Sequence, residues 1–282
     1  MNAPLGFDSI RLALAEGYPP KWASGWGEDG YGVFLEFTIE KVTQRLRWIP
    51  SGSFLMGSPD NEPGRSEYEG PQHEVTFQYG FWLFDTACTQ ELWQVVMGDN
   101  PSGFKDSPKQ PVENVSWHAV RDFIAKINLL IPGLQLTLPS ESQWEYACRA
   151  GTTTPFSFGE NITAEQVNYD GNVPYADGLK GECRNKTVAV ATLPANGWGL
   201  YEMHGNVWEW CEDEWHDSYK GATIDGQAWI SSEPDDLPGA KRVIRGGSWF
   251  YVARSVRGAC RYRDPPDFRS GYLGFRCSRV QE

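Results

Sequence analysis

The chain of 282 residues is long enough for one large domain or two small ones. Its 40% hydrophobic and 14% aromatic residues, with 13 Trp, exclude an intrinsically disordered chain and predict a packed core. The formal charge of −12 argues against nucleic acid as a partner, because phosphate binding needs a basic surface. No apolar run approaches the roughly 20 residues that cross a bilayer. Residues 1–15 lack the pattern of a signal peptide, so no membrane partner and a cytoplasmic location are expected.

Residues 1–45 differ from the rest and are interpreted as an N-terminal extension to a main domain at 46–282. Within the extension, residues 7–15 could form a short amphipathic helix. Residues 33–42 alternate between apolar and polar types, which predicts a strand.

Three helices are predicted in the middle of the chain, each after a Ser or Thr that can cap it. They are 90–97 after Thr89, 117–130 after Ser116, and 144–149 after the capping-box segment that begins at Ser140. Elsewhere 30 Gly and 19 Pro break up the sequence, and segments such as 151–160 and 168–183 read as long irregular loops. The pattern predicts an α+β domain with a high content of coil.

The cysteines are too sparse for a disulfide scaffold, and none has the CxxC spacing of a structural zinc site. Buried thiols are therefore expected at all six positions, which are Cys88, Cys148, Cys183, Cys211, Cys260 and Cys277.

A series of motifs follows in order from Trp48 to Arg276. They are Trp48-Ile-Pro-Ser-Gly-Ser-Phe-Leu-Met-Gly, Pro111-Val-Glu-Asn-Val-Ser-Trp, Leu138-Pro-Ser-Glu-Ser-Gln-Trp-Glu-Tyr-Ala, Gly199-Leu-Tyr-Glu-Met-His-Gly-Asn-Val-Trp-Glu-Trp, Arg245-Gly-Gly-Ser-Trp and Leu273-Gly-Phe-Arg. Their glycines suit tight turns beside large aromatic side chains, which indicates a structural core. The series resembles the sulfatase-modifying-factor family, which includes the formylglycine-generating enzymes. The resemblance runs from about residue 45 to 279 and implies a C-type-lectin-like fold.

The family resemblance also implies calcium, a hard cation that takes several oxygen ligands. Positions that match one family site are Glu202, Gly205, Val207 and Glu209. A second family site maps more loosely to Asn168, Tyr169, Glu182 and Arg184. The alternative at both places is a solvated acidic loop. The family further places a disulfide at the positions of Cys148 and Cys277, so these two cysteines are expected to lie close together.

The catalytic copper of formylglycine-generating enzymes is held by two cysteines shortly after the Gly-Gly-Ser motif, because two thiolates suit Cu(I). In this chain Tyr251 stands at the first cysteine position and Val256 at the spacing of the second. Cys260 lies elsewhere and alone. No copper is therefore expected, and no residue is assigned a catalytic role. The four scattered histidines do not resemble the three-histidine iron site of the hercynine-oxygenase relatives.

The segment 245–276 resembles the variable region of proteins that are diversified by retroelements, which share this fold. Such regions vary at Asn codons mutated at adenine, and these codons cannot yield Trp, Gln, Lys, Glu or Met. Twelve positions obey this restriction and are the predicted ligand-binding residues: Phe250, Tyr251, Val252, Ser255, Cys260, Tyr262, Asp264, Pro265, Phe268, Ser270, Gly271 and Tyr272. Rigid aromatic side chains mixed with small residues are typical of binding surfaces. The alternative is that these aromatic residues simply pack in the core.

Three functions are compatible with these residues. The preferred one is a non-catalytic display protein that binds an unknown protein or small molecule through residues 250–272. The others are a metal-dependent oxidoreductase of the family and an interaction module in a multi-protein system. The display hypothesis predicts that the aromatic side chains of the segment are exposed to solvent on one face.

Overall fold

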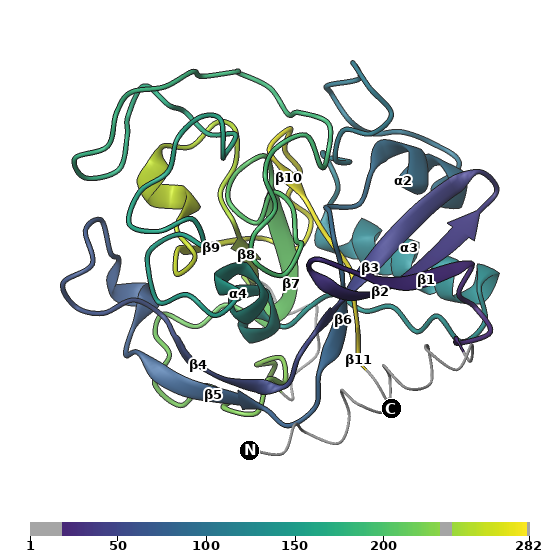
Figure 1. Cartoon of the computed structure of the whole chain (residues 1–282), viewed down its shortest axis with the longest axis horizontal. Coiled ribbons are helices and arrows are strands. Elements are labelled where there is room, and N and C mark those ends of the chain that lie inside the picture. The colour runs from purple at the N-terminus through teal and green to yellow at the C-terminus, as the bar shows by residue number, and fades with distance from the viewer. Residues whose placement is uncertain (1–18, 232–238, 281–282) are drawn as a thin grey trace.

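The computed structural model describes residues 19–231 and 239–280 (Figure 1). Its largest sheet is antiparallel and has the order β1-β2-β3-β6-β11. The strands span Gly25–Asp29, Gly32–Ile39, Val42–Ile49, Phe81–Phe84 and Ser278–Val280. The last strand pairs with β6, so the C-terminal end of the chain lies in the same sheet as its N-terminal hairpin.

A second sheet has the order β10-β7-β8-β9 and carries the segment of interest. Its strands are Leu273–Gly274, Trp208–Glu214, Arg242–Arg245 and Arg261–Asp264. Strand β10 runs parallel to β7, whereas β8 pairs antiparallel with both β7 and β9. A two-stranded ribbon of β4 (Gly52–Met56) and β5 (His73–Phe77) completes the strands that the structure describes.

The three predicted helices are confirmed, together with their caps. They are α2 (Gln90–Met97), α3 (Trp117–Leu130) and α4 (Glu141–Arg149). The Thr89 hydroxyl accepts a hydrogen bond from the Leu92 amide, and Ser140 forms the predicted capping box with Gln143. Two short 3₁₀ helices also occur, η1 (Glu67–Glu69) and η2 (Ala253–Val256). None of the helices in the described ranges is long and apolar enough to cross a membrane.

The N-terminal region differs from its prediction in one respect. Residues 33–42 do not form a single strand, because the chain reverses at Glu40, whose φ of 54° is left-handed, to form the β2–β3 hairpin. The proposed domain boundary at residue 45 falls inside β3, which pairs with β6. The hairpin is therefore continuous with the main sheet. The helix predicted at 7–15 lies outside the described residues.

Two large hydrophobic clusters form the core. One lies between α2, α3 and the sheets, where the ring of Trp93 stacks on Phe123 at 5.3 Å between centroids. The other surrounds Trp144 of α4, which is fully buried. Coil between α4 and β7 wraps the upper left of the view in Figure 1. The α+β prediction with a high content of coil is thus confirmed.

Candidate binding surface

The twelve predicted ligand-binding residues all reach the surface of the described structure. Phe250 and Tyr262 expose 60% and 51% of their area, and Pro265 is also exposed. The other nine are half-buried: Tyr251, Val252, Ser255, Cys260, Asp264, Phe268, Ser270, Gly271 and Tyr272. Of the five aromatic side chains in the segment, Phe250 and Tyr262 are exposed, whereas Tyr251, Phe268 and Tyr272 are half-buried and pack against the main hydrophobic cluster.

The residues interleaved with these twelve do not share one environment, since Arg254, Asp267 and Arg269 are exposed. Six of them are buried, namely Ala253, Val256, Arg257, Gly258, Ala259 and Arg261. The six buried residues, here called the inward set, pack against the protein, and the twelve predicted positions, none of them buried, are called the outward set.

Buried arginines fasten the segment to distant parts of the chain. Arg257 pairs with both Glu62 and Glu69, and its Nη2 lies 2.7 Å from Oε1 of Glu69. Arg261 donates two hydrogen bonds of 2.7 Å to the carboxylate of Glu141 at the start of α4. All three carboxylates are buried, so these are charge pairs removed from water.

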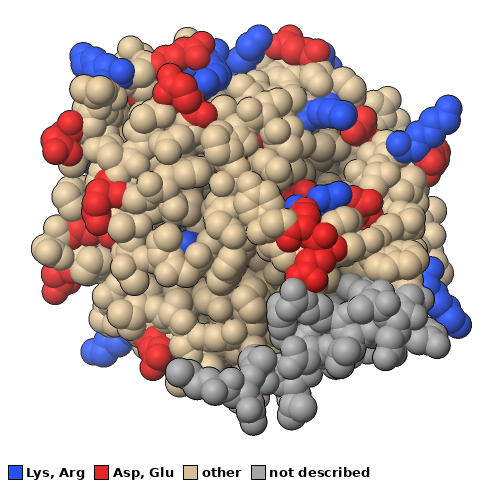
Figure 2. Space-filling model, viewed as in Figure 1, with Lys and Arg blue, Asp and Glu red and all other residues tan. Residues whose placement is uncertain are grey.

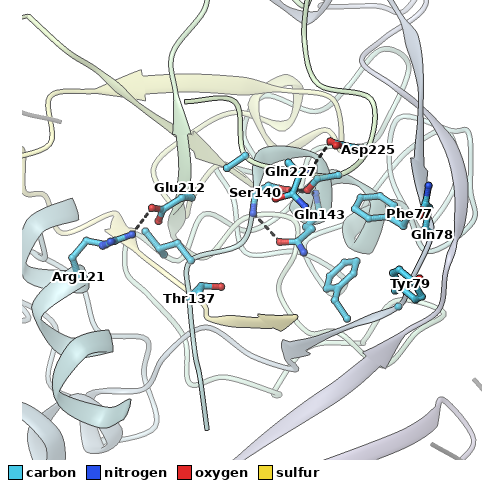
Figure 3. A pocket seen from close by; sticks show the side chains of 15 residues that line it. Phe77, Gln78, Tyr79, Arg121, Thr137, Ser140, Gln143, Glu212, Asp225 and Gln227 are labelled. Atoms are coloured by element: carbon cyan, nitrogen blue, oxygen red, sulfur yellow. Dashed lines mark hydrogen bonds and ion pairs between the residues drawn. The ribbon is translucent and has the colours of Figure 1, made fainter. Parts of the chain in front are cut away.

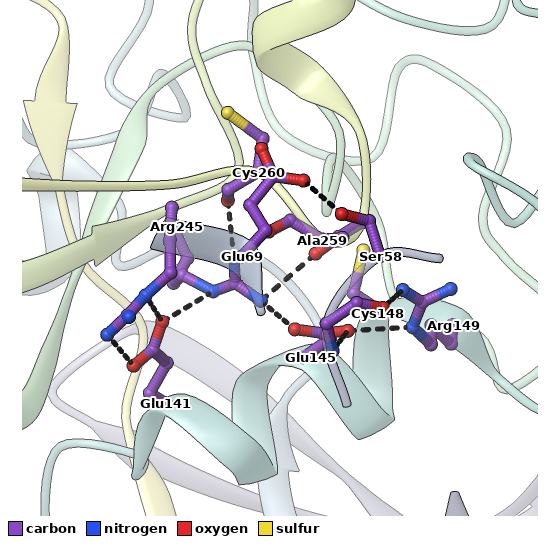
Figure 4. A network of polar contacts seen from close by, with 12 residues as sticks. Ser58, Glu69, Glu141, Glu145, Cys148, Arg149, Arg245, Ala259 and Cys260 are labelled. Carbon is purple, nitrogen blue, oxygen red and sulfur yellow. Dashed lines mark hydrogen bonds and ion pairs between the residues drawn. The ribbon is translucent and has the colours of Figure 1, made fainter. Parts of the chain in front are cut away.

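A third arginine, Arg245, lies at the centre of this network (Figure 4). It pairs with Glu145, which also accepts a 2.9 Å hydrogen bond from Arg149. Burial opposes ionisation of Glu145, but Arg149 and Arg245 hold the pKa of its carboxyl below the ordinary value. Arg245 also donates to the carbonyls of Gly258, Ala259 and Cys260, and so fixes the backbone of the segment directly.

The outward aromatic side chains contact one another in a chain of ring pairs. Phe250 stacks on Tyr272 with 6.1 Å between centroids, and Tyr251 meets Tyr272 edge-on at 5.5 Å. The buried Trp208 of β7 contacts the rings of Tyr251 and Tyr262. Sequence reasoning missed Trp208, because it belongs to a motif more than 40 residues earlier. Ring pairs of this kind hold the side chains in place with little mobility.

Tyr251 and Val256, which stand at the positions of the missing cysteine pair, make other contacts. Tyr251 belongs to the aromatic chain, where burial and the neighbouring Tyr272 raise the pKa of its hydroxyl. Val256 is buried, and its carbonyl accepts a 2.7 Å hydrogen bond from Nδ1 of His204. Burial raises the pKa of the Cys260 thiol to about 11, so this cysteine is protonated at neutral pH.

Hollows on the described surface include one beside the segment and one at the start of α4. One of about 430 Å³ adjoins the segment and is lined by residues including Val252, Arg254, Pro63 and Val173. The other, of about 440 Å³, lies at the start of α4 and is lined by Phe77, Tyr79, Ser140, Gln143 and the pair Arg121–Glu212, among others (Figure 3). Neither was predicted, because the lining residues come from separate stretches of sequence.

The structure places the calcium candidates in different environments. Glu202 is buried, its Oε1 has no hydrogen-bond partner, and burial raises its pKa to about 7. Both carboxylate oxygens of Glu209, by contrast, accept hydrogen bonds from Arg276. Gly205 lies against Asn168, whose carbonyl accepts a 2.8 Å hydrogen bond from the Asn206 amide.

The remaining candidates are divided between interior and solvent. Val207 and Tyr169 are buried, and the Tyr169 hydroxyl has no hydrogen-bond partner. The Oδ1 of Asn168 is also buried and without a partner. Glu182 is 64% exposed at its side chain and faces Arg184 at 3.4 Å. Within the described ranges no group of three or more His, Cys, Asp or Glu side chains is arranged to hold a metal ion.

The cysteines expected to pair are not brought together. Cys148 lies in the cluster around Trp144, with its sulfur 3.6 Å from Nε2 of His204. Cys277 belongs to the other cluster, together with Cys88. Burial raises the pKa of the Cys88 thiol, and the nearby Cys277 raises it further. All six cysteines are free; four are buried as predicted, whereas the expectation of burial is wrong for Cys183 and Cys260, which are half-buried because each lies in a loop at the surface.

The fold, the ordered motifs and the rebuilt cysteine positions together define a class of protein. Residues 36–281 match the sulfatase-modifying factor enzyme 1-like domain, and the chain belongs to this family. It has the α+β fold of the formylglycine-generating-enzyme type.

Two solved structures are similar over nearly their whole length. PvdO from Pseudomonas aeruginosa superimposes with a TM-score of 0.74 and 29% identity, covering 93% of this chain and 100% of that one. Treponema denticola variable protein 1 gives a TM-score of 0.69 and 27% identity, covering 88% and 99%.

Among curated relatives, the chain is 30% identical over 276 residues to the serine/threonine-protein kinase pkn1 of Chlamydia caviae, with 86% of this chain covered. It is 34% identical over 185 residues to the formylglycine-generating enzyme of Bos taurus, with 61% of this chain covered. The chain spans only 39% and 44% of the lengths of these two relatives.

Proposed function

We propose that this protein is a non-catalytic display protein, which binds a ligand through residues 250–272. The observation that supports this most is that none of the twelve predicted positions is buried, while buried ion pairs of Arg257 and Arg261 tie the same segment to the protein. Its similarity to a structure described as a variable protein agrees with retroelement diversification of the outward set.

The oxidoreductase alternative has less support from the residues. Tyr251 and Val256 offer no thiolate, and the Cys260 thiol has a pKa of about 11, so the soft ligand pair for Cu(I) is missing at these positions. A rigid surface without reactive groups suits binding, because little ordering entropy is lost when rings held by their neighbours meet a partner.

Randomising the outward set tests the display function. We expect a library varied at the twelve positions with adenine-mutated Asn codons to keep the protease resistance of the parent in most clones. A control library varied at the six inward residues should lose it, because buried pairs and packing are broken. Selection of the first library against unrelated proteins should yield binders of micromolar affinity or better. Equal loss of resistance in both libraries, or no binders, would contradict the proposal.

We further propose that calcium binds at Glu202 and stabilises the neighbouring loop. A buried carboxylate oxygen without a partner suits a hard cation. The same argument supports Asn168, whose buried Oδ1 also lacks a partner, whereas Glu209 is already engaged by Arg276. Calcium at this place would have a structural role, since Glu202 and Asn168 are both buried.

Thermal unfolding with and without calcium tests this site. At a calcium concentration about 100 times the dissociation constant, binding to the folded state adds roughly 2.7 kcal/mol, which raises Tm by about 5–10 °C. The Glu202→Gln variant should lose this rise. The matched Glu182→Gln variant should keep it, because the Glu182 side chain is 64% exposed and faces Arg184. A rise that persists in Glu202→Gln would rule out this ligand.

A further inference from the structure

The edge strand β9 presents opposite chemistry on its two faces. Tyr262 and Asp264 are two residues apart, so their side chains share one face. The other face carries Arg261, paired with Glu141, and Arg263, whose guanidinium lies 4.5 Å from the ring of Trp215. The positive charges of the strand are thus directed away from the face that Tyr262 and Asp264 share.

A chain of aromatic ring contacts begins at Tyr262 on the face that this residue shares with Asp264. The Tyr262 ring, which is half exposed, lies 6.2 Å from Trp208, and Trp208 in turn lies 5.5 Å from Tyr251. The ring of Tyr272 completes the group, 5.5 Å from that of Tyr251. Tyr262, which shares a strand face with Asp264, and Tyr251 therefore both contact the ring of Trp208.

The carboxylate of Asp264 has no hydrogen bond or ion pair with any residue in the described parts of the chain. It is half-buried, and burial raises its pKa to about 6, against the weaker opposing effect of Lys241. A half-buried carboxylate without a partner carries a desolvation cost that a cation would offset.

We propose that Asp264 and the rings of Tyr251, Tyr262 and Tyr272 form a recognition site for an organic cation, namely a Lys or Arg side chain of a partner protein. The electron-rich ring faces attract a cation, and the carboxylate neutralises its charge. An anionic group would meet both Asp264 and the net charge of −12, and a neutral aliphatic group would leave the carboxylate unpaired. This inference rests on the proposed display function, because it assigns a ligand class to the same surface.

Peptide titration monitored by calorimetry tests the site. The probes are the pentapeptide acetyl-Gly-Ser-Lys-Ser-Gly-amide, the same peptide with Arg or with uncharged norleucine, and tetramethylammonium chloride. We expect the Lys or Arg peptide to bind at least tenfold more tightly than the norleucine peptide. Asp264→Asn should weaken that binding at least tenfold and Tyr262→Leu about fivefold. The control Asp267→Asn should change it less than twofold, because Asp267 is 91% exposed at its side chain.

Several results would overturn the inference. Equal binding of the norleucine peptide, or full binding by Asp264→Asn, would show that no cation is recognised. Binding of tetramethylammonium without either basic peptide would assign the surface to a free ammonium compound instead of a protein side chain. If the randomised library yields binders while the basic peptides do not bind, the inference fails and the display function stands. If the basic peptides bind while the library yields no binders, the cation site stands and the display function fails.

Discussion

Replacing Arg245 with Met should reduce the free energy of unfolding by about 3–5 kcal/mol, the cost of breaking a buried ion pair by removing one partner. Arg245 is fully buried and pairs with Glu145, which is equally buried. The substitution would leave Glu145 with less compensating charge and the carbonyls of Gly258, Ala259 and Cys260 without their donor. Urea unfolding followed by tryptophan fluorescence measures the change.

The matched control for this experiment is Arg254→Met in the neighbouring helix η2. Arg254 is exposed and makes no ion pair within the described structure, so its replacement should change stability by no more than about 0.5 kcal/mol. A loss below about 1 kcal/mol for Arg245→Met would mean that the network of Figure 4 does not hold the segment in place.

The second large effect is expected at Gly205, where the backbone of two loops meets. Its φ is 79°, and an added Cβ would lie 2.3 Å from the carbonyl oxygen of Asn168. That backbone atom cannot move away freely, because it accepts the hydrogen bond from the Asn206 amide. Gly205→Ala should therefore cost on the order of 3 kcal/mol, from left-handed strain together with the clash.

Gly151→Ala separates these two contributions. Gly151 also has a left-handed φ, 86°, but an added Cβ would have no atom within 4 Å. Only the backbone strain remains, which costs about 1–2 kcal/mol. Equal losses for the two variants in chemical denaturation would show that the contact between Gly205 and Asn168 is unimportant.

The sequence predicted best those features that depend on interactions between residues close in the chain. The caps at Thr89, Ser116 and Ser140 determine where helices begin, because each side chain bonds an amide only a few residues away. Codon chemistry marked twelve positions of segment 250–272, none of which is buried, but it did not mark the exposed Arg254, Asp267 and Arg269. The reversal at Glu40 was missed, because the alternating pattern continues through it without a Gly or Pro to mark the turn.

Pairings between distant residues could not be read from the sequence. Nothing near Arg257 indicates Glu62 or Glu69, and nothing near Cys277 indicates that it lies in the same cluster as Cys88. Both facts depend on the path of long irregular loops, which have no periodicity to reveal their neighbours. The expected closeness of Cys148 and Cys277 came from family resemblance alone, and the structure does not show it.

The carboxylates that hold the segment come from residues 62–145, whereas their arginines lie between 245 and 261. The pair of Arg257 with Glu62 closes a loop of 195 residues, and the pair of Arg245 with Glu145 closes one of 100. Closing such long loops lowers the entropy of the chain before the stabilising contacts form, so we expect slow folding. On the ribosome, segment 250–272 can be fixed in place only after its arginines, which follow their carboxylate partners by 100 residues or more, have been synthesised.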